Sequence, residues 1–480
     1  CAFGGRRAAA RKEPIQRMAW TYTDALDELW RRSNYERGYI SNPFGSPEQA
    51  EIGRWRVRAL MAALGDPQRG PAVLHVAGSK GKGSTVAMVD AVLRASGRRT
   101  GRFTSPHLHS FRERIAIDDE PATEAAFAAL AAEATEAAER LEREEPDLGR
   151  VSTFELLTAM GFLAFAEAAC DAAVIEVGLG GLYDATNVVE PLVSVITRID
   201  LEHTAVLGDS LAAIAAQKAG VIKPARPVAV APQVDEAAAV FVETAGRLGS
   251  PLLLGGRDWR IEGEAASFRA SGPWGDYVDL RLGLPGTYQM ENAGTAIAAL
   301  WLADRAGLPI AEAAIRTGLA AARWPGRFER AVADGVEIVL DGAHTPAAAT
   351  ALAASLVAAY PGRRAQIILG ISKDKDAAAL ARALAPVAAS FVATRSANPR
   401  AADAMAVEQA IAAADLGIPT ARAEPTAAAL AVALADARRE EQPLVVAAGS
   451  LFVVADAREA LGLGAPEPFG PAVGSSPSIR

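Results

Sequence analysis

A glycine-rich turn early in the chain combines a lysine with the backbone geometry that binds phosphate. The segment HVAGSKGKGST, residues 75–85, leaves an apolar run and enters a helical pattern. Backbone N–H groups and a helix N-terminus then point at an anion, and Lys82 can reach its terminal phosphates. Three glycines permit that close approach: Gly78, Gly81 and Gly83. The order Lys82-Gly83-Ser84 departs from the strict P-loop, so a bare connecting turn is the alternative.

A carboxylate and a histidine at the ends of two later apolar runs are candidates for holding a metal ion. Glu176 closes the apolar run at 173–175, where burying an unpaired carboxylate would be costly. His203 follows the run at 193–197. A crowded triphosphate is usually neutralised by hard Mg²⁺ with oxygen ligands. An ordinary ion pair of Glu176 with Lys or Arg is the alternative. His75, next to an apolar run, is expected to be structural.

Composition limits the classes of function. The 480 residues predict two domains, and the net charge of −8 argues against a nucleic-acid partner. The two cysteines, Cys1 and Cys170, fit a reducing compartment, so the cytoplasm is expected. No apolar run is long enough to span a membrane. Residues 1–17 are expected to be a disordered leader, and residues 464–480 a disordered tail.

Short β-branched runs alternate with helical patterns, which predicts an α/β fold with parallel sheets. In the first part we expect strands at 73–77, 173–177 and 193–197, with helices from residues 84, 154 and 210. Broken alternation at 258–282 predicts a small antiparallel insert before a helix at 291–306. The RWPGR stretch at 323–327 marks a junction. Further strands are expected at 336–341, 366–370, 391–394 and 444–447, with helices from residues 346, 375, 407 and 426.

Several collinear motifs resemble those of the folylpolyglutamate synthase and dihydrofolate synthase family, in the Mur ligase superfamily. Besides residues 75–85, they are TSPHL (104–108), STFE (152–155), EVGLGGLYDATN (176–187), LEHT (201–204), QKAGVIK (217–223), PGRFE (325–329), DGAHTP (341–346) and SANPR (396–400). The resemblance implies a P-loop-containing Mur-ligase-like ATPase domain with a parallel sheet at 18–323. It also implies a smaller Rossmann-like α/β domain at 324–463, which carries the glutamate-ligase function.

The resemblance also assigns catalytic and nucleotide-binding residues. It implies that Ser105 and Glu176 ligate one Mg²⁺ and His203 another, and that Lys218 is carbamylated to N6-carboxylysine; a solvated helix lysine is the alternative for Lys218. Catalytic roles are expected for Lys82, Glu176, His203 and Lys218. The expected ATP-binding residues are Gly78, Gly81, Lys82, Gly83, Ser84, Thr85, Asn292, Arg327 and Asp341. A helix cap and a surface charge are the alternatives for Asn292 and Arg327.

The substrate residues follow from the same resemblance. The pterin end is expected at Ser152, Thr153, Phe154, Glu155, Tyr183, Asp184 and Ala185. An acidic side chain such as Asp184 can pair with the donors of a pterin, whereas plain helix core is the alternative for Phe154. His344 and Ser450 are expected in a glutamate pocket of the second domain.

The implied reaction uses ATP to convert a substrate carboxylate into an acyl phosphate, which the amine of L-glutamate attacks. Lys80, Leu182 and Thr345 depart from the common bacterial pattern. Lys80, Tyr183 and Thr345 resemble eukaryotic members, which favours tetrahydrofolate over dihydropteroate. A monomer is expected. The alternatives are dihydrofolate synthesis alone, another Mur-type ligase, and a P-loop nucleotide switch. The STFE motif and the match at 183–185 argue against another Mur-type ligase.

Overall fold

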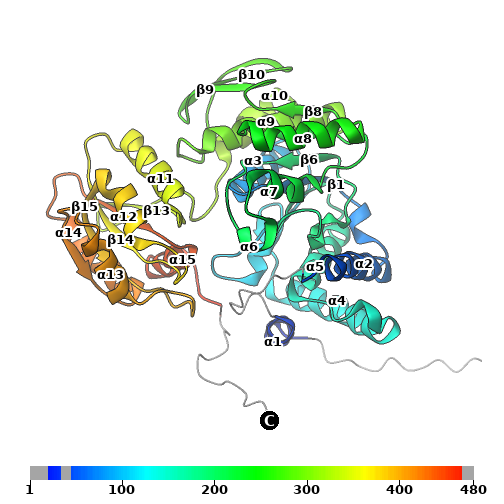
Figure 1. Cartoon of the computed structure of the whole chain (residues 1–480), viewed down its shortest axis with the longest axis horizontal. Helices are drawn as coiled ribbons and strands as arrows, with labels where there is room; N and C mark the ends of the chain where they lie inside the picture. Colours follow the sequence, from blue (N-terminus) through cyan, green and yellow to red (C-terminus); the bar gives the residue numbers. More distant parts are fainter. Residues whose placement is uncertain (1–19, 34–44, 468–480) are drawn as a thin grey trace, which may run out of the picture.

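The computed structural model describes residues 20–33 and 45–467, which form two α/β units of unequal size. Figure 1 shows the larger unit, coloured blue to green, beside the smaller unit in yellow to red. The predicted leader at 1–17 lies outside the described residues, as do residues 468–480 of the predicted tail. Residues 464–467 are described, and the Glu467 carboxylate accepts hydrogen bonds from the Tyr22 hydroxyl and the Phe111 N–H, at 2.6 and 2.8 Å.

The larger unit is built on an eight-stranded sheet with the order β4-β3-β2-β5-β1-β6-β7-β8. Its strands are β1 (Ala72–Ala77), β2 (Thr100–Phe103), β3 (Ile115–Ile117), β4 (Glu120–Pro121), β5 (Ala172–Glu176), β6 (Val193–Ile196), β7 (Val228–Val230) and β8 (Leu252–Leu254). The strands from β2 to β8 in this order run parallel, whereas β3 and β4 pair antiparallel at one edge. The carboxyl ends of β1, β5 and β6 therefore meet at one side.

Helices cover both faces of this sheet. They are α1 (Tyr22–Arg32), α2 (Pro47–Ala63), α3 (Lys82–Ala95), α4 (Glu124–Glu144), α5 (Thr153–Glu167), α6 (Thr204–Leu207), α7 (Leu211–Ala219), α8 (Asp235–Leu248), α9 (Gln289–Arg305) and α10 (Glu312–Ala321). Alternate residues of each strand face opposite sides. Val73 and Ile175 pack with α4 and α5, whereas Leu74 and Val174 pack with α3, α9 and α10. No helix among the described residues is both long and apolar enough to cross a membrane.

A three-stranded antiparallel sheet follows β8 and packs on α9, above the large sheet in Figure 1. It consists of β9 (Arg260–Glu264), β10 (Ser267–Gly272) and β11 (Gly275–Leu280). The Trp259 ring fits against Gly294 of α9, where a Cβ atom would lie 2.2 Å from the ring. This insert is the one that the broken alternation predicts.

The smaller unit contains a six-stranded sheet with the order β12-β13-β17-β14-β15-β16. Its elements are β12 (Glu329–Ala333), β13 (Val336–Leu340), α11 (Pro346–Ala359), β14 (Ala365–Leu369), α12 (Ala377–Leu384), β15 (Ala388–Ala393), α13 (Ala404–Ala413), β16 (Thr420–Arg422), α14 (Thr426–Ala437), β17 (Leu444–Ala448) and α15 (Leu451–Ala460). Only β12 pairs antiparallel within it. One face packs on α11 to α13 and the other on α14 and α15.

The two units meet through polar contacts near the junction between α10 and β12, where the predicted boundary at 323/324 lies. The Tyr288 hydroxyl donates to Asp341 at 2.7 Å, and Thr287 N–H donates to the Ser355 hydroxyl at 3.0 Å. On another side, the Arg458 guanidinium donates to His109 at 3.1 Å. These contacts bring the carboxyl ends of β1 and β13 toward one another.

The α/β prediction is confirmed, and every strand and helix predicted by position has a counterpart in the structure. Two features differ from an all-parallel expectation. Strands β3, β4 and β12 pair antiparallel at sheet edges. Short hairpin connections join β3 to β4 and β12 to β13, whereas residues 104–114 connect β2 to β3. The sequence does not predict β2, β3, β4, β7, β8, β12 or β16; all but β12 have four residues or fewer, and such short strands carry little periodic signal.

Two helical glycines should respond in opposite ways to the same substitution. A Cβ on Gly318 of α10 would lie 2.4 Å from the Val92 backbone in α3, whereas a Cβ on Gly246 of α8 meets nothing within 4 Å. Gly318→Ala should therefore lower the free energy of unfolding by about 1–3 kcal/mol through overpacking. Gly246→Ala should raise it by about 0.5–1 kcal/mol through helix propensity. Urea denaturation measures both; equal effects would refute the close α3–α10 packing.

Candidate active site

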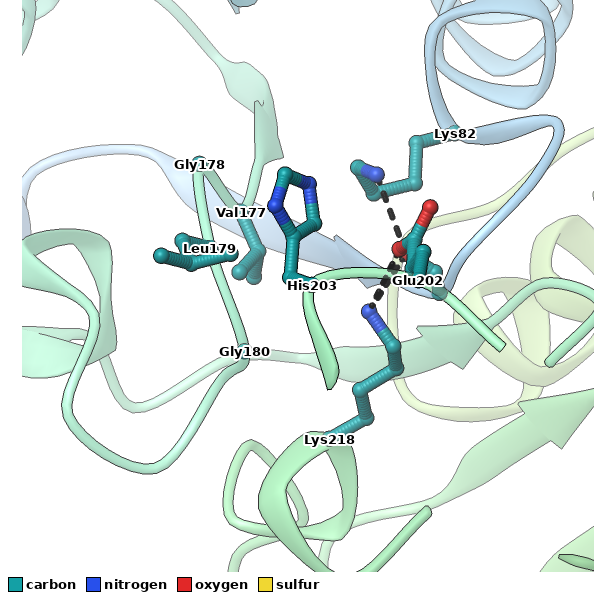
Figure 2. Close-up of a pocket in the computed structure, with 9 residues that line it drawn as sticks. Lys82, Val177, Gly178, Leu179, Gly180, Glu202, His203 and Lys218 are labelled. Carbon is teal, nitrogen blue, oxygen red and sulfur yellow. Dashed lines mark hydrogen bonds and ion pairs between the residues drawn. The ribbon is translucent and has the colours of Figure 1, made fainter. Parts of the chain in front are cut away.

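A polar pocket opens where the carboxyl ends of β1, β5 and β6 meet. It is lined by Gly78, Lys82, Val177, Gly178, Leu179, Gly180, Glu202, His203 and Lys218. Figure 2 shows Lys82 and Lys218 turned toward Glu202, with His203 beside it; these four residues come from three separate segments. In parallel α/β sheets, ligands bind at this end of the strands. Four of the residues singled out by the sequence, namely Gly78, Lys82, His203 and Lys218, thus line one pocket.

The glycine turn is shaped by close contacts that exclude side chains. Gly78 has φ +145°, and a Cβ there would lie 1.8 Å from the Thr197 hydroxyl. Gly81 has φ +90°, and its Cβ would lie 2.1 Å from the Asn292 amide oxygen. Gly83 approaches the Trp324 indole, where a Cβ would lie 2.8 Å from the ring nitrogen. Packing therefore requires glycine at all three predicted positions, and backbone conformation also requires it at Gly78 and Gly81.

Helix α3 begins at Lys82, so its N-terminal N–H groups face the turn. The Lys82 ammonium donates to the Gly78 carbonyl at 3.0 Å, which folds the side chain back over the turn. Ser84 is buried and accepts a hydrogen bond from Gln289 at 3.1 Å. The Thr85 hydroxyl is buried and has no hydrogen-bond partner among the described residues. Lys82 is thus the member of this group that lines the open pocket.

Glu176 ends β5 beneath the pocket and is 5% exposed. Its carboxylate accepts a hydrogen bond from Ser105 N–H at 3.3 Å. Burial raises the pKa of Glu176 to about 7, although the nearby charges of Lys82 and Arg327 lower it. None of the ion pairs formed among the described residues includes Glu176, so the salt-bridge alternative is not what this geometry shows.

Lys218 in α7 is 2% exposed, so the alternative of a solvated helix lysine does not hold. Its ammonium donates to the Gly78 carbonyl at 2.8 Å and to Glu202 at 3.3 Å. Burial and the charge of Lys82 lower the pKa of Lys218 to about 8, against the opposing effect of Glu202. Burial tends to raise the pKa of Glu202, but the charges of Lys82, Lys218 and Lys80 bring that pKa below its ordinary value.

His203 adopts a left-handed backbone conformation with φ +48°, immediately before α6. That conformation is uncommon for a residue with a side chain and is found often at functional sites. Burial lowers the pKa of His203, so the neutral imidazole, which can ligate a metal, is favoured. The carbonyl of His203 accepts from Val206 and Leu207 N–H, at 2.8 and 2.9 Å.

Of the other predicted nucleotide residues, Arg327 and Asp341 belong to the second unit and Asn292 to α9 of the larger unit. Arg327 is close enough to Glu176 and Asp341 to lower the pKa of both carboxyls. Asp341 is buried and accepts from Tyr288 hydroxyl, Phe328 N–H and Ala343 N–H, at 2.7 to 2.9 Å. Asn292 lies in the first turn of α9 and donates to Gln289 at 2.8 Å, so it does not cap that helix.

His344 and Ser450 follow the neighbouring strands β13 and β17. The Gly449 N–H donates to the Ala343 carbonyl at 2.8 Å and joins the two loops. His344 Nδ1 lies 2.8 Å from the Gly342 carbonyl and donates to it, which leaves Nε2 free to accept. The Ser450 hydroxyl accepts from Phe452 N–H at 3.1 Å and caps α15.

The predicted pterin residues divide between two places. Ser152 caps α5 and forms a capping box with Glu155, which also binds Arg56 at 2.6 Å. Thr153 donates to the Leu29 carbonyl at 2.7 Å. The Phe154 ring packs against Gly178, which lines the pocket, and so links helix core to the site.

A second pocket contains the other predicted pterin residues. It is lined by Gly53, Arg54, Val57, Arg58, Tyr183, Asp184, Ala185, Asn187 and Val188. The Asp184 carboxylate accepts from Leu179 N–H at 2.8 Å and from Thr186 N–H at 3.0 Å. Its acceptor capacity is therefore directed to its own loop, and burial raises its pKa.

Comparison with known proteins places this geometry in a family. The Mur ligase middle domain matches residues 76–300, and the Mur ligase glutamate ligase domain matches residues 326–451. The folylpolyglutamate synthase of Lacticaseibacillus casei is 38% identical over 332 residues, which are 68% of this chain and 77% of that protein. The chain belongs to the folylpolyglutamate synthase family of Mur ligases.

Other relatives agree with this assignment. The dihydrofolate synthase/folylpolyglutamate synthase of Mycobacterium tuberculosis is 37% identical over 372 residues, covering 73% of this chain and 76% of that protein. The folylpolyglutamate synthase of the same organism complexed with ADP superposes with a TM-score of 0.82 at 33% identity, over 93% of this chain and 99% of that one. The fold and family implied by the motifs are thus confirmed.

Two features of this folylpolyglutamate synthase family member were not singled out from its sequence. Glu202, inside the LEHT motif, and Gly178–Gly180, inside the EVGLGGLYDATN motif, line the pocket beside the predicted residues. Their positions in the sequence, next to His203 and close after Glu176, are the signal that could have identified them. The interpretation of His75 as structural agrees with its place: it is fully buried in β1, and its Nε2 lies 2.8 Å from the Thr186 hydroxyl.

His75 should make stability depend on pH. Burial lowers the pKa of His75 from 6.5 to about 3, so below pH 6.5 the unfolded chain takes up a proton that the folded chain does not. The neutral His75 ring therefore contributes fully to the free energy of unfolding above pH 6.5. Below pH 6.5 this contribution falls by about 1.4 kcal/mol for each pH unit. The difference in unfolding free energy between wild type and His75→Gln should therefore shrink from pH 7 to pH 5. It should stay constant from pH 7.5 to 8.5; a constant difference throughout would contradict a buried neutral His75.

Proposed function

We propose that this chain adds L-glutamate to a reduced folate through an amide bond, using ATP and releasing ADP and phosphate. The observation that supports this proposal most directly is the pocket lined by Lys82, His203 and Lys218. It lies at the carboxyl ends of the strands, beside the N-terminus of α3. The relatives named folylpolyglutamate synthase support the substrate class. One solved relative is described as an FPGS–AMPPCP–folate complex, at a TM-score of 0.76 and 33% identity over 92% of this chain.

The chemistry requires two steps. A carboxylate oxygen of the folate attacks the γ-phosphorus of ATP, the bond to the β-phosphate oxygen breaks, and ADP leaves. The glutamate amine then attacks the acyl carbon, loses a proton, and expels inorganic phosphate. The reaction needs no protein nucleophile, so positioning and charge stabilisation are the contributions expected from the protein. Gly78, Gly81, Lys82, Gly83, Ser84 and Thr85 remain our assignment for the phosphate cradle.

Magnesium is part of the proposal. Among the described residues, no three His, Cys, Asp or Glu side chains gather closely enough to hold a metal by themselves. The nearby oxygen and nitrogen donors still fit metal ions whose remaining ligands are phosphate oxygens. Glu176 is buried without a cation partner, and neutral His203 lines the pocket above it. Ser105 and Glu176 would hold one Mg²⁺ and His203 a further one, and both ions would neutralise charge on the triphosphate.

Lys218 is suited to the proposed carbamylation. The lowered pKa, about 8, increases the fraction of neutral amine that can react with carbon dioxide. The nitrogen–carbon bond forms with loss of a proton, and a buried cation becomes an anion. The carbamate would then favour positive charge nearby, including Lys82 and Mg²⁺.

The second unit and helix α9 of the larger unit would supply the remaining contacts. Asn292, Arg327 and Asp341 are proposed for the nucleotide, and His344 with Ser450 for the incoming glutamate. The free Nε2 of His344 and the position of both residues after adjacent strands support this assignment. The Ser450 hydroxyl already accepts from Phe452, so it retains only donor capacity and a lone pair for glutamate.

The folate end is proposed at Phe154 and at the pocket that contains Tyr183, Asp184 and Ala185. We favour tetrahydrofolate as the substrate. Dihydropteroate is the second candidate, because several relatives are named both dihydrofolate synthase and folylpolyglutamate synthase. Ser152, Thr153 and Glu155 would act through the position of Phe154, since their side chains bond to protein groups. We further propose that the enzyme acts as a cytoplasmic monomer; Cys170 is a buried free thiol, which suits a reducing compartment.

Substrate dependence tests the function directly. Purified protein with ATP, Mg²⁺ and glutamate should release ADP when tetrahydrofolate is added, with a product heavier by one glutamyl residue. Dihydropteroate in place of tetrahydrofolate tests the dihydrofolate synthase alternative. ADP release that ignores both pterins would support another Mur-type ligase, and release without glutamate would support a nucleotide switch.

Two substitutions test the site. Lys82→Ala and Glu176→Gln should each lower kcat by about 10²- to 10³-fold. Lys82 would stabilise negative charge on the transferring phosphoryl group directly, and Glu176 would do so by holding Mg²⁺. Steady-state ADP release measures the effect, and circular dichroism checks that both variants fold. Arg439→Ala, at an exposed ion pair, is the control and should stay within about twofold of wild type. Near-normal kcat in either site variant would refute its assignment.

A further inference from the structure

Arg458, near the end of α15, joins three separate segments of the chain. Its residue is 8% exposed, and Figure 1 shows α15 on the side of the smaller unit that faces the larger unit. The Arg458 Nε donates to His109 Nε2 at 3.1 Å. One terminal nitrogen donates to the Glu329 carboxylate, and the other donates to the Leu463 carbonyl at 2.7 Å. One buried guanidinium thus holds the larger unit, the start of β12 and the chain after α15.

The contact with His109 docks a loop of the larger unit on the smaller one. His109 Nδ1 lies 3.0 Å from the Glu459 carboxylate and donates to it, while Nε2 accepts from Arg458. The His109 side chain is 7% exposed. The preceding residue, Leu108, packs against the hydrophobic core of the smaller unit that includes α14 and α15. Polar and apolar contacts therefore hold residues 108 and 109 together.

This loop, residues 104–110, also carries Ser105, and we call it the Ser105 loop. Three successive N–H groups, at 108–110, donate to the Glu113 carboxylate, at 2.8 to 3.0 Å. Near the start of the loop, Ser105 N–H donates to Glu176 at 3.3 Å. The docked end of the loop is thus fixed within its own unit, and the other end lies at the predicted metal ligand.

The contact with Glu329 reaches the junction between the units. One oxygen of Glu329 accepts from Arg458, and the other accepts from Gly326 N–H at 2.8 Å. Arg327 lies inside this short closed segment, near enough to Glu176 to lower the pKa of that carboxyl. Arg458 therefore contacts both the loop that carries Ser105 and the segment that carries Arg327.

The chain after α15 packs over the contact between Arg458 and His109. Gly464 lies against the imidazole, where a Cβ atom would be 2.4 Å from His109 Nε2. Further along, the Glu467 carboxylate accepts from Phe111 N–H of the larger unit at 2.8 Å. These contacts agree with the low exposure of both side chains, and a hydrogen bond that water reaches poorly is a firmer attachment than an exposed one.

We propose that Arg458 is a positioning residue, which holds the Ser105 loop and the Arg327 junction at fixed positions around Glu176. Arg458 does not line the pocket, so it would act through its two partners. An ordinary ion pair between the units is the alternative, and it would affect stability without a selective effect on these two segments. The inference rests on the proposed function only in assigning Ser105, Glu176 and Arg327 to the metal–nucleotide site.

Hydrogen exchange tests the positioning without any ligand. Arg458→Met should increase amide exchange at both 108–111 and 326–328, by about tenfold or more. His109→Leu should increase exchange only at 108–111, because Arg458 still holds Glu329. Ser355→Ala is the matched control: it removes a hydrogen bond between the units, to Thr287 N–H, and should leave both segments unchanged. An increase in only one segment of Arg458→Met, or in neither, would overturn the proposal.

Binding of the ATP analogue AMPPCP provides the second measurement. Residues that orient metal ligands typically change metal affinity by about 10- to 100-fold when mutated. Calorimetric titration should therefore show that Arg458→Met needs about tenfold more Mg²⁺ for half-maximal AMPPCP binding. Arg458→Lys should recover part of the loss, because an ammonium can keep one of the contacts. His109→Leu should raise the requirement by a smaller factor and should add nothing to Arg458→Met in the double variant.

The outcomes separate the positioning role from the proposed function. Failure of wild-type protein to bind AMPPCP with Mg²⁺ would overturn the proposed function, whereas the exchange measurement would still test Arg458. Wild-type binding with an unchanged Mg²⁺ requirement in Arg458→Met would overturn only the positioning role. Additive effects in the double variant would also overturn it, because they would show that Arg458 and His109 act independently. If Arg458→Met does not fold, Arg458→Lys and His109→Leu carry the same tests.

Discussion

The site depends on a concentration of positive charge that the fold holds out of water. The ammonium groups of Lys80, Lys82 and Lys218 surround one glycine turn, and two of them contact the carbonyl of Gly78. Like charges at this density repel each other strongly when water is excluded. Glu202 offsets part of the repulsion, and Glu176 lies below without an ion-pair partner among the described residues. Such an arrangement is suited to a polyanion that completes the charge balance.

The sheet topology makes this concentration of charge feasible. Strands β5, β1 and β6 are neighbours in the sheet although β1 and β5 are separated by most of a hundred residues of chain. Each ends at the same edge, so the phosphate turn, Glu176 and the His203 loop are brought together by strand pairing alone. Helix α7 then places Lys218 under the turn. Because these supports are buried and hydrogen-bonded, the charged groups cannot separate to relieve their repulsion.

Contacts between the two units place a second set of groups over the pocket. Asp341 is tied to Tyr288, and Arg327 lies near both Asp341 and Glu176. The second unit therefore contributes a cation, Arg327, close to Glu176.

The sequence by itself determined the α/β class, the position of the antiparallel insert and four of the nine residues that line the pocket. Glycine turns after apolar runs, and polar residues at the ends of those runs, are local features, and a parallel sheet necessarily gathers them at one edge. Tertiary structure alone decided the remainder. Glu202 could not be distinguished from a solvated carboxylate until Lys80 and Lys218 were seen on either side of it. Likewise, Asp184 as a free pterin partner was a reasonable prediction, but its oxygens bond to Leu179 and Thr186 N–H. Pairings between distant residues depend on packing geometry, which residue type and spacing do not encode.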